Sequence, residues 1–274
     1  MIFAKRTVGA SAMLLLAASA GAWSPGDTAA PSPAAVSDRV GTIYEISRDV
    51  ETTEKSSDGS ASSSTDRDTL LERVIRVRSD GLELEYDLPK EATAQDRTSS
   101  WQFPFRAFKP FLGPSQLLNQ PELEGRIEAW LKKGGLTHAA CGHWVFTWNA
   151  FKIECDPQST LETVAAYDLR PSDLRDSTSS IDPDRVRREQ AQSDVVVAEI
   201  SKKALTLDDA ISARSKDKIS GTIATSFEVD PSGFVRQRTK VTKLETTGSN
   251  GVVTDRTVIE VLKRRVVPGR ESPR

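Results

Sequence analysis

The stretch Gly81-Leu-Glu-Leu-Glu-Tyr-Asp-Leu88 alternates apolar and acidic residues along its whole length. In an extended chain its four apolar side chains share one face, and the carboxylates of Glu83, Glu85 and Asp87 share the other. This period predicts a β-strand with one face in the core and one in solvent, which is typical of antiparallel sheets. We expect the three carboxylates to be solvated groups without a catalytic role.

Two runs before this stretch have the same period. A connection rich in Ser, Asp and Gly, residues 56–64, separates them, and the turn Ser79-Asp-Gly81 leads from the second run into the strand above. The apolar residues expected on the core face are Tyr44, Ile46 and Val50 in the first run and Leu71, Ile75 and Val77 in the second. Residues 37–89 are therefore predicted to form an antiparallel β-meander.

The C-terminal part repeats this organisation over residues 219–267. Asp230-Pro-Ser-Gly233 and Gly248-Ser-Asn-Gly251 are turn sequences that divide it into three strand-like runs. Both blocks open with Gly-Thr-Ile. These features predict a second meander, which joins the first edge to edge in one curved antiparallel sheet.

Between the meanders, residues 101–218 read as a helical, aromatic-rich insert packed on one face of the sheet. Three helices are expected, over residues 121–133, from Ser159, where a capping box begins, and over residues 183–203. The polar stretch of residues 170–182 is predicted to be a loop. The expected fold is thus α+β, with a single domain over residues 37–267.

Residues 1–22 have the three parts of a cleavable secretory signal peptide. A positive region at residues 5–6 is followed by an apolar stretch and by small residues that end in Ala20-Gly-Ala22, which suits a signal peptidase. Residues 23–36 are expected to be a disordered linker, and residues 268–274 a polar tail. The mature protein is therefore expected to be exported, periplasmic or secreted, and soluble.

Composition and motifs exclude several function classes. The chain carries 37 Lys and Arg against 39 Asp and Glu, a net charge of −2, without the concentrated basic face that a nucleic-acid partner requires. After the signal peptide no stretch is long and apolar enough for a membrane span. A phosphate-binding Gly-rich loop and the G-x-S-x-G and H-E-x-x-H motifs are absent, so we expect neither an enzyme nor a bound cofactor.

The two cysteines, Cys141 and Cys155, bracket a segment rich in aromatic and β-branched residues, which predicts a hairpin whose ends meet. In an oxidising compartment such a pair favours a disulfide. Two alternatives stay open from the residues alone. His138 and His143 complete, with the cysteines, a set of four zinc ligands whose spacing matches no common zinc module. Cys141 with His143 is also the residue pair of a cysteine nucleophile and its base.

Aromatic residues concentrate in the insert, where ten of the seventeen lie between Trp101 and Phe151. Two interpretations are open: they form the core between the helix at residues 121–133 and the sheet, or they line a pocket for an apolar ligand. The candidate ligand-binding residues are Trp101, Phe105, Phe108, Trp144, Trp148 and Phe151.

The segment Ala140-Cys-Gly-His-Trp-Val-Phe-Thr-Trp-Asn149 resembles a stretch found in a family of uncharacterised exported bacterial proteins with no assigned activity. The expected architecture resembles, more loosely, the half-barrel carriers of lipoproteins and lipids in the bacterial envelope. The resemblance implies a non-enzymatic protein that binds an apolar ligand or lipidated cargo. A protein–protein interaction or scaffold role in the envelope is the alternative.

Overall fold

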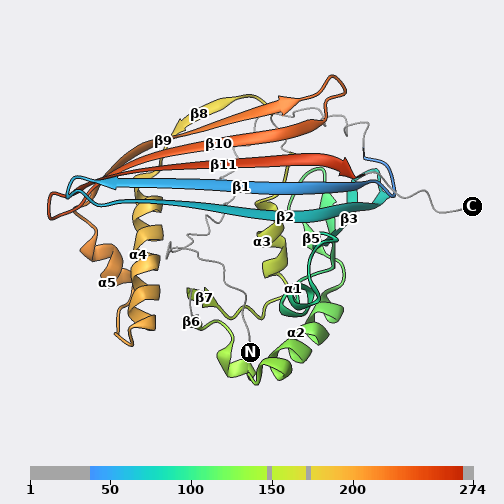
Figure 1. Ribbon diagram of the computed structural model, residues 1–274, viewed down its shortest axis with the longest axis horizontal. Coiled ribbons are helices and arrows are strands. Elements are labelled where there is room, and N and C mark those ends of the chain that lie inside the picture. Colours follow the sequence, from blue (N-terminus) through green and yellow to red (C-terminus); the bar gives the residue numbers. More distant parts are fainter. Residues whose placement is uncertain (1–37, 147–149, 171–173, 268–274) are drawn as a thin grey trace, which may run out of the picture.

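The computed structural model describes residues 38–146, 150–170 and 174–267. The expected signal peptide, the linker and the polar tail lie outside these residues. The described chain is built around one antiparallel sheet (Figure 1). Its nine strands run in the order β5-β4-β3-β2-β1-β11-β10-β9-β8, and within the described residues nothing pairs the two edges, so the sheet is open.

The strands are long in the middle of the sheet and short at its edges. They are β1 (Ile43–Ser56), β2 (Ala61–Val77), β3 (Gly81–Asp87), β4 (Phe105–Pro110), β5 (Gln116–Leu117), β8 (Ser177–Ser180), β9 (Lys218–Val229), β10 (Val235–Thr247) and β11 (Val253–Val267). The edge strand β8 lies in the polar stretch of residues 170–182, which the sequence predicted to be a loop.

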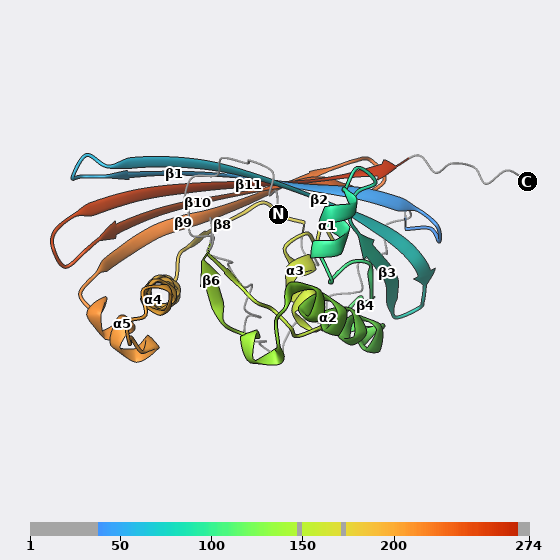
Figure 2. The same cartoon turned by 60° about the horizontal axis from the view of Figure 1, so that its bottom comes forward.

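The two meanders join edge to edge, as the sequence predicted, and the strands that meet are β1 and β11. These strands pair antiparallel from Ile43 opposite Val267 to Ser56 opposite Thr254. Figure 2 shows the sheet arching over helices α2 to α5, which lie on its inner side. The α+β class, with a curved antiparallel sheet and a helical insert on one face, is confirmed.

The first connection is shorter than the sequence predicted. Residues 61–64, expected in the connection, belong to β2 and pair with β1. A tight turn closes the hairpin before them, in which the Asp58 carboxylate accepts hydrogen bonds from the backbone and the hydroxyl of Ser60. Pairing with the long β1 thus extends β2 through a serine-rich sequence of low strand propensity.

The core face of β2 differs from the prediction. The β2 residues that are buried against the helical side are Leu70, Glu72 and Val74. The face predicted from Leu71, Ile75 and Val77 is therefore wrong. A glutamate on the buried face, and a bulge after Val74, interrupt the apolar alternation from which a strand's face is inferred.

The helices of the described residues are α1 (Ala94–Ser99), α2 (Gln120–Gly134), α3 (Ser159–Ala165), α4 (Pro183–Ile200) and α5 (Leu207–Ala213), with a short 3₁₀ helix, η1 (His138–Ala140). α2 confirms the helix expected over residues 121–133. It buries a stripe of Leu123, Ile127 and Leu131 and ends at Gly135 in the left-handed conformation.

The other two predicted helices are present, with corrections to their details. α3 begins at Ser159, but without a capping box, because the Ser159 hydroxyl donates to the carbonyl oxygen of Asp156. α4 is N-capped by Asp182 and buries Ala191 and Ala198. Val197, near its C-terminal end, is 59% exposed.

The hydrophobic core lies under one end of the sheet. Its largest fully buried apolar side chains are Tyr44, Ile46, Leu84, Phe105, Leu123, Leu169 and Leu262. At the other end, α4 and α5 present mainly the small residues Ala191, Ala198 and Ala210 to the interior. The sheet is therefore packed tightly at one end and only partly covered toward the other.

Candidate functional site

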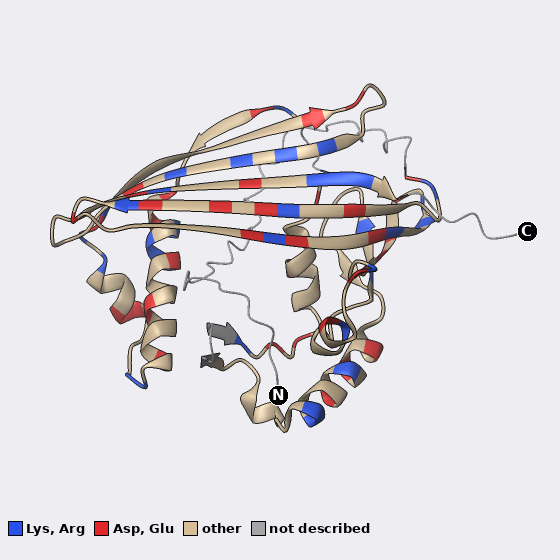
Figure 3. Ribbon diagram, in the orientation of Figure 1, with Lys and Arg blue, Asp and Glu red and all other residues tan. Residues whose placement is uncertain are grey.

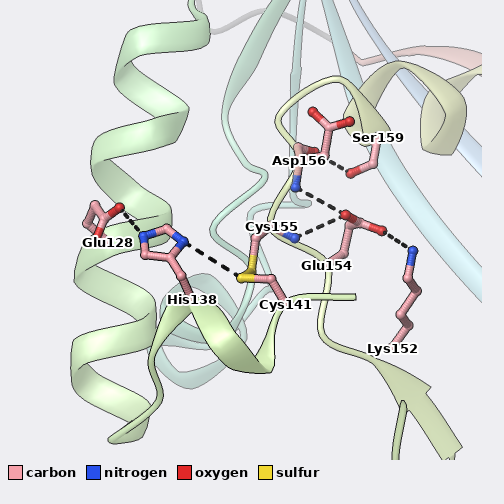
Figure 4. Close-up of a disulfide and its surroundings, with 8 residues drawn as sticks. All are labelled: Glu128, His138, Cys141, Lys152, Glu154, Cys155, Asp156 and Ser159. Carbon is pink, nitrogen blue, oxygen red and sulfur yellow. Dashed lines mark hydrogen bonds and ion pairs between the residues drawn. A yellow bond between two sulfur atoms is a disulfide. The ribbon is translucent and has the colours of Figure 1, made fainter. Parts of the chain in front are cut away.

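The strands β6 (Trp144–Phe146) and β7 (Ala150–Lys152) form the hairpin predicted between the cysteines. Cys141 and Cys155 form a disulfide at the base of this hairpin, as Figure 4 shows. The sulfurs are 2.03 Å apart and the Cα atoms 5.6 Å apart. The bond closes the hairpin onto the segment that leads into α3.

The two histidines beside the disulfide contact carboxylates. His138 Nε2 lies 2.6 Å from Glu128 Oε1, and His143 Nδ1 lies 3.4 Å from Glu199 Oε1. Because the Cys141 sulfur is held in the disulfide, it supplies neither a zinc ligand nor a nucleophile in this state. Within the described ranges, no three His, Cys, Asp or Glu side chains gather as metal ligands.

Replacing both Cys141 and Cys155 with serine is expected to lower the free energy of unfolding by about 3 kcal/mol, because the disulfide closes a loop of about 15 residues in the unfolded chain. Urea unfolding of the double variant beside the parent protein measures the difference. An unfolding midpoint of the parent protein that is unchanged by reductant would contradict this expectation.

Three of the aromatic candidates belong to the core. Trp101, Phe105 and Phe108 are 4%, 0% and 7% exposed, and Phe105 stacks on Tyr86 with ring centroids 5.1 Å apart. Trp144 is half-buried and lies in the separate β6–β7 sheet. Trp148 and the side chain of Phe151 lie outside the described structure. Trp101 and Phe105 therefore belong to the core cluster that contains the α2 stripe, and Phe108, on the other face of β4, lies under the Arg78 guanidinium.

A different set of residues forms a partly covered, mainly apolar surface on the inner side of the sheet. We call it the inner patch; it consists of Val50, Thr52, Ile223, Thr242 and Val258, from β1, β9, β10 and β11. The register places Thr52 and Thr242 directly opposite Val258, and Ile223 opposite Thr242, so the set is contiguous across four strands. All five side chains face the helices and are only half-buried.

The contrast along β11 defines the limits of the patch. Leu262, on the same face, is fully buried in the core. Val258, four residues away, is half-buried, as is Ile259 on the opposite, outer face. The inner face is thus only partly covered at Val258, although a curved sheet normally packs its concave side.

A charged band separates the inner patch from the core. Arg48 donates two hydrogen bonds to Glu260, at 2.9 and 2.7 Å, and Arg238 donates one at 2.9 Å. Lys240 lies beside them, and burial lowers its pKa more than Glu260 raises it. Because Arg48 and Arg238 are both held in ion pairs with Glu260, the band forms a fixed polar border on one side of the inner patch.

A polar hollow borders the inner patch on its other side. It has a volume of about 340 Å³ and lies where the β10–β11 turn meets α4 and the segment after α5. The inner-face neighbour of Thr52 on β1 is Glu54, and that of Val258 on β11 is Arg256. Both Glu54 and Arg256 line the hollow. Its walls are Glu54, Gln190, Arg214, Asp217, Leu244, Thr246, Gly248, Asn250, Val252, Thr254 and Arg256.

Two of the four charged residues in the hollow are paired with neighbours. Arg214 donates to Asp194 at 2.6 and 2.9 Å and lies 3.5 Å from Asp217; the hydrogen bonds to Asp194, more than burial, set its pKa above the ordinary value. Glu54 and Arg256 are different. They are direct cross-strand neighbours, yet within the described chain neither side chain makes a hydrogen bond or an ion pair, and the Arg256 Nε is buried without an acceptor.

A buried ion cluster of Asp38, Glu72, Arg170 and Arg264 lies in the core. Arg170 donates to both Glu72 oxygens at 2.7 Å and to both Asp38 oxygens at 3.0 Å. Arg264 donates to Glu72 at 2.9 Å and to Asp38 at 3.0 Å, and stacks 3.6 Å from the ring centroid of Tyr44. The cluster ties the segments before β1 and after α3 to β2 and β11. Figure 3 shows acidic and basic residues interspersed along these strands.

The ion cluster predicts an acid-sensitive contribution to stability. Burial raises the pKa of Asp38, but Arg170 and Arg264 outweigh it and lower the pKa from 3.8 to about 2. A carboxylate with a lowered native pKa stabilises the fold above its unfolded pKa, and this contribution, at most about 2 kcal/mol, is lost as the pH falls from about 4 through 2. Asp38→Asn is expected to remove this part of the pH dependence of unfolding. If the free energy of unfolding falls in parallel for the two proteins between pH 4 and pH 2, the expectation is contradicted.

The residues of the hollow and of the ion cluster were not among the sequence-predicted site residues. The available signal is a charged residue at a strand position where alternation places an apolar one, as at Glu72 and Arg256. Reading that signal requires the register between strands nearly 200 residues apart, which the sequence alone does not provide.

No protein-family model matches the chain, and no curated protein matches it. A solved structure with detectable likeness is one of lipovitellin, which concerns lipid–protein interactions in that protein. The TM-score is 0.28 at 8% identity, over 86% of this chain and 26% of lipovitellin. The chain thus spans about a quarter of that protein, and a TM-score of this size lies below that of a shared fold. No helix among the described residues is long and apolar enough to cross a membrane.

Proposed function

We propose that this protein is a non-enzymatic carrier that binds an apolar or amphiphilic ligand, or the lipid part of a lipidated cargo, on the inner patch. The observation that supports the proposal is the half-burial of Val50, Ile223 and Val258 on the concave side of the sheet, where a core residue such as Leu262 is fully buried. Covering them with an apolar segment is favourable by about 25 cal/mol for each Å² removed from water.

The dimensions and borders of the inner patch fit an amphiphile. From β9 to β1 it crosses three strand spacings, roughly 14 Å, which suits an extended acyl chain lying across the strands. The ion-paired band at Glu260 and the polar hollow at Arg256 border it on its two sides. A ligand with one apolar part and one polar end can contact both kinds of surface.

Export is part of the proposal. Two observations support it: the sequence of residues 1–22, and the disulfide of Cys141 with Cys155, a bond that persists in oxidising compartments. In a periplasmic or secreted setting, an apolar ligand needs a protein to shield it from water in transit, and the concave side of an open sheet serves that purpose.

Native mass spectrometry of the protein recovered from the compartment to which it is exported tests this function, together with titration of a fluorescent fatty acid. The expected results are a mass that exceeds the polypeptide by one lipid and saturable uptake of the probe at one site. A clean polypeptide mass and no saturable uptake would together contradict the carrier function.

The second candidate is an envelope interaction or scaffold role, which one observation favours. All four residues of the edge strand β8 are exposed, and in the described structure β8 pairs with β9 alone. Such an edge is a template for an added strand from another chain. A crosslinking pull-down from intact cells should recover a repeatable partner that is linked through residues 177–180, and no repeatable partner would count against this role.

A further inference from the structure

The polar hollow borders the inner patch and holds two charged side chains without a partner in the described chain. Its position beside the inner patch and the two unpaired charges within it are independent observations that bear on its use. We propose that the hollow binds the zwitterionic head group of an amphiphile, with its phosphate on Arg256 and its ammonium on Glu54. This inference rests on the proposed carrier function, and its test is designed so that each can fail separately.

Arg256 is the anion-binding group. Its Nε is buried and has no acceptor, and no hydrogen bond or ion pair within the described chain involves its guanidinium group. Arg238 and Arg264 also have a buried Nε without an acceptor, but their other nitrogens donate to carboxylates. A partly buried guanidinium without a counterion is unfavourable, and a phosphate accepts the bidentate hydrogen bonds that a guanidinium donates.

Glu54 is the cation-binding group. It lies directly opposite Arg256 on the same face of the sheet, but the two form no ion pair within 4 Å and both face the hollow. A purely anionic ligand on Arg256 would meet repulsion from the Glu54 carboxylate. A ligand that carries both a positive and a negative charge compensates both residues at once, and this favours a zwitterion such as phosphoethanolamine.

The remaining polar side chains hold the walls of the hollow in place. Gln190 accepts from Arg214 at 3.3 Å, and Asn250 accepts from the backbone N–H of Val252 at 3.1 Å. Arg214 is already neutralised by acidic partners, so it adds little net charge. A volume of about 340 Å³ lies at the low end of the roughly 300–1,000 Å³ found for small-molecule sites, which suits a head group.

The hollow and the inner patch are continuous along the sheet. Arg256 and Val258 are successive inner-face residues of β11, and Glu54 and Thr52 are successive inner-face residues of β1, so each pair is roughly 7 Å apart. A head group in the hollow therefore places the first carbons of its chain at the inner patch. The same ligand occupies both.

The test compares three single-chain lipids of equal chain length, with phosphoethanolamine, phosphoglycerol or uncharged glycerol head groups, on the full chain and on Arg256→Gln and Glu54→Gln. We expect Arg256→Gln to weaken both phospholipids about tenfold or more and to leave the uncharged lipid within about twofold. Glu54→Gln should weaken the phosphoethanolamine lipid alone. An equal loss of affinity for all three lipids, or no loss of affinity with either variant, would overturn the proposal.

A second measurement separates this proposal from the carrier function. If the parent protein binds none of the lipids, the carrier function fails, and free phosphoethanolamine and inorganic phosphate are titrated while the backbone amide signals of residues 248–252 are followed by NMR. Saturable shifts with phosphoethanolamine that Arg256→Gln abolishes support a soluble zwitterion as the ligand of the hollow. Shifts with inorganic phosphate alone, or none, overturn it. Circular dichroism of each variant confirms that the fold is retained.

Discussion

Replacing Glu72 with glutamine is expected to lower the free energy of unfolding by about 3–5 kcal/mol, although the two side chains have nearly the same shape. Glu72 is 2% exposed and accepts three hydrogen bonds from Arg170 and Arg264. Its carboxylate is one of two that balance these buried guanidinium groups. The variant keeps the volume but removes the charge, so the loss reports the uncompensated positive charge left in the core.

Glu45→Gln is the matched control for this change. Glu45 lies on β1 and pairs across the outer face with Arg265, whose side chain is 75% exposed. Exposed pairs contribute about 0–1 kcal/mol, so the same substitution there should change the free energy of unfolding by less than about 1 kcal/mol. Urea unfolding of both variants at pH 7 measures the difference. Equal losses at the two positions would contradict a special role for the ion cluster.

Replacing Val258 with aspartate is expected to weaken binding of an apolar ligand by about a hundredfold. The substitution puts a carboxylate in the middle of the inner patch, where a bound acyl chain would exclude the water that solvates it. Because Val258 is only half-buried in the free protein, the stability of the fold should change little. Titration of a fluorescent fatty acid gives the affinity, and thermal unfolding gives the stability.

Ile259→Asp provides the control for Val258→Asp. Ile259 is the next residue on β11, is also half-buried, and faces the outer side of the sheet. The same charge placed there should leave the affinity within about threefold of the parent protein, since it is on the other side of the sheet from the ligand. Loss of binding in both variants would place the ligand elsewhere or indicate a general effect on the fold.

Local patterns were sufficient to predict most of the architecture. The alternation over residues 81–88 identified β3, and the turn sequences between strand-like runs predicted the two meanders. The helix expected over residues 121–133 matches α2, which has Pro121 in its first turn and Gly134 as its last residue. Each of these features depends on residues close in sequence, which is why it can be read without coordinates.

The errors arose where a distant contact outweighed the local pattern. β2 extends through its serine-rich part because β1 pairs with it, and β8 forms in a polar stretch because β9 provides a partner. The face of β2 was misassigned because Glu72 occupies a core position that only Arg170 and Arg264 make tolerable. The partners of β8 and of Glu72 lie far away in sequence, and β1, although adjacent to β2, supports it only once the hairpin has formed.

The candidate site could be predicted only in part. The disulfide follows from two cysteines around a hairpin sequence, but the aromatic residues that looked like a pocket include Trp101, Phe105 and Phe108, which are core. Apolar content does not reveal whether a side chain is covered. Glu54 and Arg256 are separated by 202 positions and meet only through the pairing of β1 with β11.

Photo-crosslinking with a diazirine-bearing fatty acid tests the location of the ligand most directly. After irradiation of the full chain, tandem mass spectrometry assigns each labelled residue. We predict fatty-acid labels on the inner patch, at Val258, Thr242 and Ile223. We predict no labels above background on the outer-face residues Ile259 and Val241. Labels confined to the outer face or to the β6–β7 hairpin, or no saturable labelling at all, would contradict it.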